Sequence, residues 1–227
     1  MDKLSRRDFF YLTASLSLMY PLRAYAMNSE NSDQRFDYPN TLLILKQAFK
    51  AEMIAHKNYL GYIGKALAEN HPNIAYMFYA FSFSEKVHAD NYKRIISKFG
   101  GEIKDVIVSI DVRDTKSNLQ KAAEKELEKI KYFYPEILQK LESESCEEAI
   151  INCMYSWKSH RQHEEKVKEL KRYSGLFFGS VASHIEKMDL DFHICNICGS
   201  TIDNKPESPC EICNRPMSHY EKVNRPA

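Results

Sequence analysis

Four long stretches of this chain repeat apolar residues every three or four positions, and this feature restricts the possible folds more than any other. The stretches cover residues 41–68, 72–99, 118–142 and 146–173. In the second stretch the repeat reads Phe78, Phe81, Glu85, His88, Tyr92, Ile95 and Phe99. This spacing predicts amphipathic helices. Because a longer linker follows the second stretch, the chain is expected to be mostly α, an antiparallel four-helix bundle with one crossover.

Local signals mark where these helices begin, bend and end. Thr41 is expected to cap the first helix, and Pro72 suits the first turn of the second. Gly100 and Gly101 end that second helix. Pro135 lacks an amide donor and crowds the preceding turn, so it is expected to kink the third helix. The buried face of the third helix is predicted to carry Leu119, Ala123, Glu126, Ile130, Phe133, Ile137 and Leu141.

Six polar residues interrupt the apolar faces near the middle of the four predicted helices. They are Glu52, Glu85, His88, Glu126, His160 and His163. One histidine on an apolar face is more often a packed core residue, and one glutamate is often half of an ion pair. A buried carboxylate without a partner is costly, however, and three of them facing one core are best explained by a shared cation. The pattern therefore predicts a buried metal site.

The spacing within the helices suggests a site for two metal ions. Residues three positions apart lie side by side on a helix, so Glu85 with His88, and His160 with His163, can each offer two donor atoms. Carboxylates that bridge two ions, with imidazoles at the ends, are typical of di-iron and di-manganese helical bundles. This donor set favours iron or manganese over zinc.

Three neighbouring polar residues are weaker candidates for the same site. His56, one turn after Glu52, is expected at the rim. Lys129, close to Glu126, has the wrong charge for a ligand. Glu164 is expected to be exposed and is a reserve ligand.

Near the C-terminus, Cys195 and Cys198 form one pair and Cys210 and Cys213 a second, each with two residues between its cysteines. Two such pairs can place four thiolates around one tetrahedral ion. Iron would make this segment a one-electron carrier and zinc a structural ribbon, whereas oxidising surroundings would favour two disulfides. The remaining thiols, Cys146 and Cys153, are expected in or near the core.

The first 26 residues are predicted to be an export signal. They combine a basic start, an uncharged run from Phe9 to Tyr20 and a small-x-small site ending at Ala26. This run is too short for a membrane anchor, which needs about 20 residues. The pair Arg6-Arg7 resembles a twin-arginine signal, which predicts a periplasmic protein exported with its cofactors already bound.

The charge of the remaining chain argues against nucleic acid as a partner. Removing the signal takes four of the 32 basic and two of the 31 acidic side chains, which leaves 28 and 29. The near balance, without a basic stripe on any predicted helix, also argues against electrostatic binding to membranes.

Residues 41 to 220 resemble the rubrerythrin family, in which a ferritin-like di-iron bundle precedes a rubredoxin-like Fe(Cys)4 module. The resemblance rests on "AFKAEMIAHKNY", "FSEKVHADNY", "NLQKAAEKELEKIKYFYP" and the four cysteines. It implies that Glu52 and Glu126 each bind one metal, that Glu85 bridges, and that His88 and His163 supply imidazoles. The implied organisation is a signal (1–26), a linker (27–40), the bundle (41–174), a second linker (175–192) and the cysteine domain (193–227).

Two positions depart from the family pattern. His160 stands where the family has a second bridging glutamate, and a neutral imidazole nitrogen binds one ion at a time. Lys129 replaces a further glutamate that exchanges with a histidine when the irons change oxidation state. That exchange is therefore not implied for this chain, and a di-iron, mixed-metal or mononuclear site all remain open.

The resemblance implies an oxidoreductase that reduces hydrogen peroxide to water at Glu52, Glu85 and Glu126. Electrons would come from a donor that the sequence does not identify and pass through the four cysteines. A homodimer is expected, because in the family one subunit's cysteine module lies beside the other's bundle. The alternatives are an iron-sequestering protein without turnover and a zinc-ribbon interaction module on a helical scaffold.

Overall fold

The computed structural model describes residues 38–104, 106–174 and 178–227, with the side chains of 165–178 excepted. The described residues belong to one compact unit. The predicted export signal lies outside them. Among the described residues, no helix is long and apolar enough to cross a membrane.

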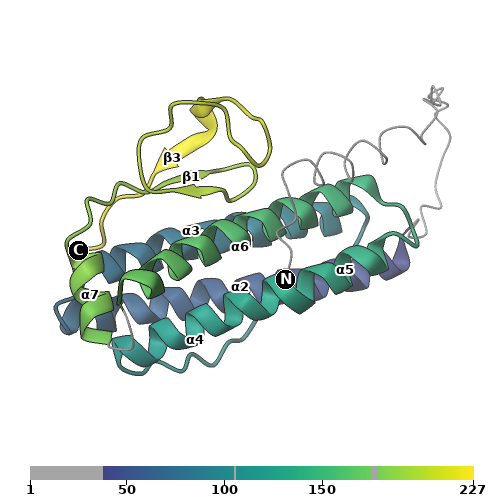
Figure 1. Ribbon diagram of the computed structural model, residues 1–227. Coiled ribbons are helices and arrows are strands. Elements are labelled where there is room, and N and C mark those ends of the chain that lie inside the picture. The colour runs from purple at the N-terminus through teal and green to yellow at the C-terminus, as the bar shows by residue number, and fades with distance from the viewer. Residues whose placement is uncertain (1–37, 105, 175–177) are drawn as a thin grey trace, which may run out of the picture. The chain divides into compact units, whose positions relative to one another are not determined.

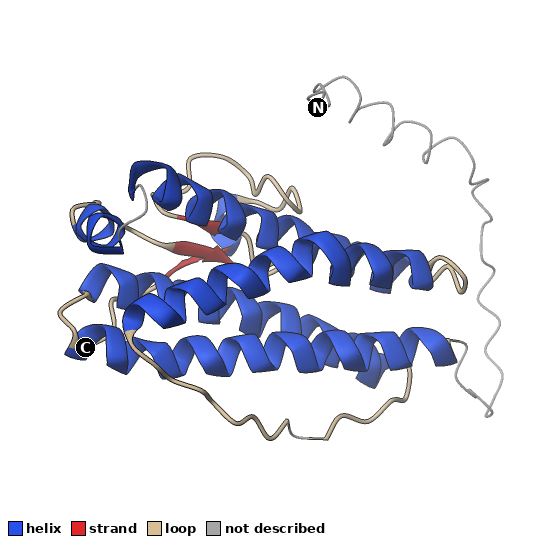
Figure 2. Ribbon diagram, turned by 60° about the horizontal axis from the view of Figure 1, so that its bottom comes forward, coloured by secondary structure: helices blue, strands red, loops and turns tan. Residues whose placement is uncertain are grey.

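The structure is a bundle of four helical rods (Figures 1 and 2). The first two rods are α2 (Pro39–Ala68) and α3 (Pro72–Lys98), the third consists of α4 (Thr115–Glu128), the π-helix η1 (Lys129–Phe133) and α5 (Tyr134–Leu141), and the fourth is α6 (Glu147–Ser174). Glu69 near the end of α2 bonds to the start of α4, and Glu144 beyond α5 bonds to the start of α2. These two rods are therefore antiparallel, and the predicted bundle with its crossover is confirmed.

The first helix begins differently from the prediction. It starts at Pro39, inside the predicted 27–40 linker, so Thr41 lies within the helix and is fully buried rather than forming its cap. The Glu144 carboxylate instead accepts hydrogen bonds from the backbone N–H groups of Asn40 and Thr41, at 3.0 and 2.7 Å. Pro39 explains the shift, because a proline suits the first turn of a helix.

The third rod contains a π-helix that changes which residues face the core. The N–H of Tyr134 bonds to the carbonyl of Lys129, five residues earlier. Pro135 follows at once, so the expected distortion occurs as a widened turn. The predicted core positions Ile130 and Phe133 are only partly buried, and Lys129 and Tyr134 are buried in their place.

The predicted linker 175–192 contains a helix, α7 (Phe178–Glu186). Its last residue, Glu186, accepts hydrogen bonds from the backbone N–H groups of Asn73 and Ile74 at 2.9 and 3.2 Å. The first N–H groups of a helix have no acceptor within the helix. A carboxylate at this position accepts hydrogen bonds from them and interacts favourably with the helix dipole. The segment thus caps α3 and is not simply a connection.

The cysteine module, residues 193–227, is a small sheet that packs on α3 and α6 (Figure 1). Strand β1 (His193–Cys195) lies between β2 (Thr201–Ile202) and β3 (Tyr220–Lys222), antiparallel to both. The Tyr76 hydroxyl of α3 donates to the carbonyl of Val223 and accepts from the N–H of Phe192, at 2.7 and 3.0 Å. Phe192, Ile194 and Val223 join the apolar core of the bundle, so the two parts share one core.

Candidate metal centres

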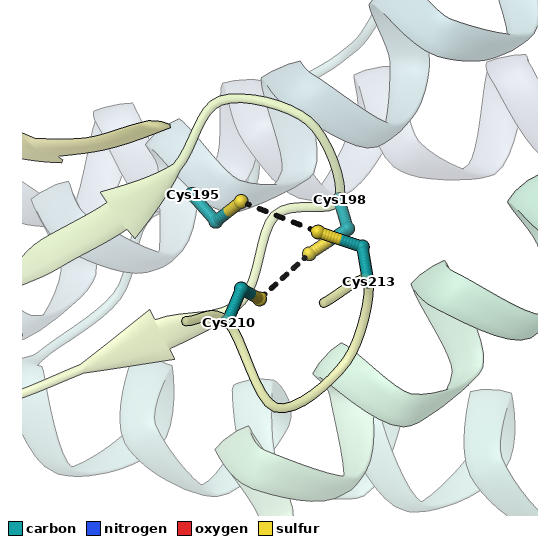
Figure 3. A group of neighbouring side chains, drawn as sticks. All are labelled: Cys195, Cys198, Cys210 and Cys213. Carbon is teal, nitrogen blue, oxygen red and sulfur yellow. Dashed lines mark hydrogen bonds between the residues drawn. The ribbon is translucent and has the colours of Figure 1, made fainter. Parts of the chain in front are cut away.

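The four cysteines of the module form one cluster (Figure 3). The sulfurs of Cys195 and Cys213 are 3.7 Å apart, and those of Cys198 and Cys210 are 3.4 Å apart. A tetrahedral ion with metal–sulfur bonds of about 2.3 Å separates its sulfurs by about 3.8 Å. The cluster therefore fits a tetrathiolate metal site with little rearrangement.

Two tight turns hold these thiols. The N–H of Gly199 donates to the carbonyl of Cys195 at 2.9 Å, and the N–H of Asn214 donates to that of Cys210 at 2.8 Å. Both Gly199 and Asn214 have positive φ, which glycine and asparagine tolerate best. Hydrogen bonds from Cys195 and Cys198 lower the pKa of the Cys210 thiol, which favours the thiolate form that binds metal.

The bundle brings together all six predicted donors, which come from all four rods. Their exposed fractions are between 0 and 2%. They form two overlapping groups of four, each with its ligand atoms within 4.8 Å of one another. We call Glu52, Glu85, His88 and His160 the first half-site, and Glu85, Glu126, His160 and His163 the second half-site.

Glu85 lies between the two half-sites and presents one oxygen to each. Its Oε2 is 3.8 Å from His88 Nδ1, and its Oε1 is 3.9 Å from His163 Nδ1. Glu85 Oε1, His88 Nδ1 and His163 Nδ1 are all buried without a hydrogen-bond partner. Buried polar atoms are rarely left in this state, so these three atoms fit metal ligands.

The module fixes the orientation of two of the imidazoles. His88 Nε2 donates to the carbonyl of Cys198 at 3.2 Å. His163 Nε2 contacts Thr201 Oγ1 at 3.1 Å, and this hydroxyl donates to the carbonyl of Gly199. Both rings therefore carry their proton on Nε2 and keep the Nδ1 lone pair for the half-sites.

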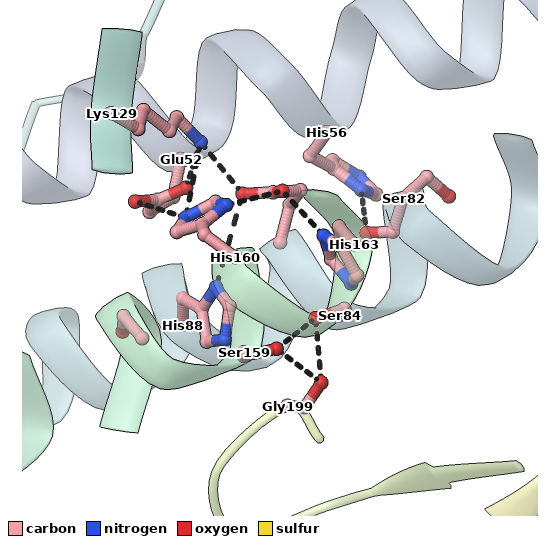
Figure 4. Close-up of polar contacts among 12 residues, drawn as sticks. Glu52, His56, Ser82, Ser84, His88, Lys129, Ser159, His160, His163 and Gly199 are labelled. Carbon is pink, nitrogen blue, oxygen red and sulfur yellow. Dashed lines mark hydrogen bonds and ion pairs between the residues drawn. The ribbon is translucent and has the colours of Figure 1, made fainter. Parts of the chain in front are cut away.

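His160 faces both half-sites with its two nitrogens (Figure 4). Its Nδ1 donates to Glu126 Oε2 at 2.6 Å, and its Nε2 lies 3.4 Å from Glu52 Oε1. Burial and Lys129 lower the pKa of this imidazole, but Glu85, Glu126 and Glu52 outweigh them and raise it to about 10. In the metal-free protein His160 is therefore a cation.

Lys129 extends into the first half-site (Figure 4). Its Nζ donates to Glu52 Oε2 at 2.5 Å and to Glu85 Oε2 at 2.9 Å, and lies 3.5 Å from His160 Nε2. Burial lowers the pKa of this ammonium, but Glu52 and Glu85 raise it above its usual value. The residue whose charge excludes it as a ligand therefore occupies the space among the ligands.

The pKa values of the three buried carboxyl groups are shifted in different directions. Burial raises the pKa of Glu52, but Lys129 and His160 hold it well below its usual range. Burial also raises that of Glu126, and His160 reverses this effect. For Glu85, burial dominates and raises the pKa well above its usual range. The neighbouring cations thus favour the ionised forms of Glu52 and Glu126, whereas burial favours the neutral form of Glu85.

Sequence reasoning missed two tyrosines that hold the carboxylates. The Tyr59 hydroxyl donates to Glu126 Oε1 at 2.6 Å, and the Tyr134 hydroxyl donates to Glu52 Oε1. Tyr59 lies two helical turns after Glu52 on the same helix, and this spacing was an available signal. Tyr134 had no such signal, because its burial depends on the π-helix.

The weaker candidates lie outside the two donor groups. His56 is half-buried, and its Nδ1 donates to the carbonyl of Ser82 at 2.9 Å, which agrees with a rim position. Glu164 is buried, so its predicted exposure is wrong. Cys146 and Cys153 are buried free thiols, as expected.

A cavity of about 470 Å³ lies beside the bundle site. Lys129 and Tyr59, which both contact the carboxylates, line it together with Lys121 and Lys125. A small polar molecule in this cavity would meet the Lys129 side chain before reaching Glu52.

Comparison with known proteins identifies the family. Residues 44–171, more than half of the chain, match the model of the rubrerythrin family. The chain belongs to the rubrerythrin family. Among curated members, rubrerythrin-2 of Clostridium acetobutylicum is 28% identical over 176 residues, which is 74% of this chain and 89% of that protein. Nigerythrin of Nitratidesulfovibrio vulgaris is 25% identical over 191 residues, 83% of this chain and 89% of that protein.

Solved structures confirm the fold that the rubrerythrin resemblance implied. Mixed-valent nigerythrin superposes with a TM-score of 0.70 at 20% identity and covers 90% of this chain and 100% of its own. Bacterioferritin BfrA of Mycobacterium tuberculosis gives a TM-score of 0.58 at 14% identity, over 69% of this chain and 96% of its own. The fold is therefore a ferritin-like bundle with a rubredoxin-like cysteine knuckle, and its two donor clusters are those of a non-haem iron protein.

Proposed function

We propose that this protein is an exported oxidoreductase that reduces hydrogen peroxide to water at the bundle site, with electrons entering through the cysteine module. The observation that carries the proposal is the contact between His88 Nε2 and the carbonyl of Cys198, at 3.2 Å. Cys198 is a predicted ligand of one metal centre and His88 of the other. One peptide and one imidazole therefore link the two centres.

The overall reaction breaks one O–O bond and consumes two electrons and two protons for each peroxide. The four cysteines would hold an iron that supplies one-electron transfer, so an external one-electron donor would have to act twice for each peroxide. Iron in the bundle would act as Lewis acid and electron source. The described residues supply the surroundings: Tyr59 and Tyr134 orient Glu126 and Glu52, and Lys129 lines the cavity through which peroxide would enter.

Electron transfer in this proposal takes place within one chain. The family resemblance implied a module beside the bundle of a second subunit, whereas this chain's module contacts its own α3 and α6. A homodimer stays a prediction, since two copies that exchange modules would form the same contacts. Light scattering of the purified protein at micromolar concentration measures whether it is a monomer or a dimer.

Export is the second part of the proposal. It rests on the Arg6-Arg7 pair, the short uncharged run and the site at Ala26. Fractionation of cells that express the full chain, with sequencing of the mature N-terminus, tests it. A protein found in the periplasm and beginning at Met27 supports export; an uncleaved cytoplasmic protein contradicts it.

The activity is tested by mixing anaerobic, iron-loaded protein with hydrogen peroxide and an artificial reductant. Repeated turnover is expected. Glu85→Gln, which alters the carboxylate shared by both half-sites, should lower the rate by more than the roughly 10- to 100-fold that loss of an outer-shell partner costs. Glu136→Gln, on the exposed surface of α5, is the matched control. A single oxidation without further cycles would instead support the iron-sequestering alternative, which the charge of Lys129 favours.

The identity of the metal in the cysteine cluster tests the remaining alternative, a zinc-ribbon interaction module. A ferric tetrathiolate is red and a zinc tetrathiolate is colourless. An absorption spectrum of protein purified without air therefore separates an electron carrier from a structural zinc ribbon, and a colourless protein with one zinc per chain would remove the proposed electron route.

A further inference from the structure

We propose that the bundle binds one metal ion rather than two, that this ion occupies the second half-site, and that the Lys129 ammonium is a permanent second cation in the first half-site. The inference deepens the proposed function, because it rests on the bundle being a metal site.

The contacts of Lys129 single out the first half-site. Its Nζ lies within 3.5 Å of Glu52, Glu85 and His160, which are three of the four donors there. An ion bound by these donors would need the same position. Lys129 is 9% exposed and has two charge-assisted hydrogen bonds, so displacing it would also mean breaking these bonds.

The second half-site keeps two donors available, and its other two, His160 Nδ1 and Glu126 Oε2, hydrogen-bond to each other at 2.6 Å rather than to Lys129. Glu85 Oε1 and His163 Nδ1 have no hydrogen-bond partner, and Glu126 Oε2 is 3.6 Å from His163 Nδ1. Lys129 occupies the other oxygen of Glu85, Oε2. Glu85 would then bridge between an ion and an ammonium group, in place of two ions.

The charges of the site support a single ion. Glu52, Glu85 and Glu126 are fully or almost fully buried and carry three negative charges when ionised. The Lys129 ammonium cancels one of them, so one divalent ion with neutral imidazoles makes the site neutral. A second divalent ion would leave two uncompensated positive charges in a buried site, which is strongly unfavourable.

His88 is the one donor of the first half-site outside these Lys129 contacts. Its Nε2 bonds to Cys198, and its Nδ1 lies 3.8 Å from the Glu85 oxygen that Lys129 contacts. In this arrangement His88 binds no ion itself, and the link from the cysteine module to the ion continues through Glu85, whose Oε1 would bind the ion in the second half-site.

Titration with Mn²⁺ counts the ions in the bundle. The full chain is used with its cysteine cluster already filled, since thiolates select softer metals and Mn²⁺ prefers carboxylates and imidazoles. Wild type should bind about one Mn²⁺ per chain by calorimetry, and its electron paramagnetic resonance spectrum should be that of an isolated ion. Lys129→Glu should bind about two, with a spectrum broadened by coupling between neighbouring ions.

Two further variants make this test specific. Lys125→Glu is the matched control, because Lys125 lines the same cavity one turn earlier but is exposed and paired with Glu128. It should keep about one Mn²⁺ per chain. Lys129→Gln removes the ammonium without adding a carboxylate, and a second, weaker ion should then bind. It serves in place of Lys129→Glu if the latter fails to fold.

The outcomes separate this inference from the proposed function. Wild type that binds two ions with coupled spectra would overturn the inference, because Lys129 would then swing aside, and the proposed peroxide reduction would stand. Lys129→Glu and Lys129→Gln that both keep one ion would also overturn it. Wild type that binds no ion in the bundle would remove both proposals.

Discussion

The four thiols of the cysteine module come from two short turns, whereas the six donors of the bundle come from four rods that must align over a long distance. In the module, local hydrogen bonds to Cys195 and Cys210 position the ligands. In the bundle, each donor depends on the register of its helix and on partners from other elements, such as Tyr134 for Glu52 and Cys198 for His88. The first site is built from local backbone geometry and the second from tertiary packing.

This difference shows in which site a metal ligand can be replaced without loss of the fold. Replacing one cysteine removes a quarter of the module's ligands. The bundle holds His160 and Lys129 at positions where the family resemblance implied glutamates, and a protonated imidazole and an ammonium group can balance the same buried carboxylates. In a helical bundle, a cationic side chain can therefore take the place of a metal ion in balancing buried carboxylates.

The largest effect that tests this comparison is expected from Cys198→Ser. It removes a ligand from the module, so the tetrathiolate absorption should be lost and steady-state peroxide turnover should fall to background. The bundle should keep its metal, because its donors come from the helices. Metal analysis with an absorption spectrum measures both. Cys153→Ser, which changes a buried thiol of the core, is the control. Loss of the bundle metal as well would show that the two sites are not independently built.

The sequence was sufficient for features that depend on local spacing. The period of the helices predicted the bundle and its six buried donors, and the paired cysteines predicted the cluster. It was insufficient where backbone geometry departs from regular helix. The π-helix turns Lys129 and Tyr134 inward instead of Ile130 and Phe133, and no periodicity could show this. The capping role of α7 and the contact of His88 with Cys198 depend on tertiary contacts between distant segments, which helical periodicity does not encode.

The next largest effect concerns the contact between the two centres. A Cβ on Gly199 would lie 2.3 Å from His88 Nε2, and Gly199 has a φ of +77°. Gly199→Ala should therefore push the module away and slow electron transfer to the bundle by up to about 100-fold. Stopped-flow oxidation of the reduced cysteine cluster by peroxide measures this rate. Gly64→Ala, where a Cβ would meet nothing within 4 Å, is the control. An unchanged rate would exclude the His88–Cys198 route.

A smaller effect is expected from Tyr134→Phe, which leaves the cysteine module untouched. Glu52 would lose a buried hydrogen-bond donor, and Tyr92 would lose its contact with Tyr134 at 3.3 Å. The free energy of unfolding should fall by about 1–3 kcal/mol, measured by urea denaturation of the metal-free protein. Tyr132→Phe is the control, because Tyr132 is 69% exposed on the π-helix that immediately precedes Tyr134. Equal stabilities of the two variants would contradict the assigned support of Glu52 by Tyr134.

The smallest effect should come from Glu69, a surface carboxylate tied to backbone rather than to metal. Hydrogen bonds from Lys65 and Thr115 lower its pKa to about 2, against roughly 4.3 in an unfolded chain. Its contribution to stability is therefore complete above about pH 4.3 and is lost as the pH falls through about 2.

The difference in unfolding free energy between wild type and Glu69→Gln should shrink over this window, and should be the same with and without metal. Glu124→Gln, on the exposed face of α4, is the matched surface control. A metal-dependent difference at Glu69 would mean that the capped ends of the bundle are coupled to its buried centre, which the separate contacts of Glu69 argue against.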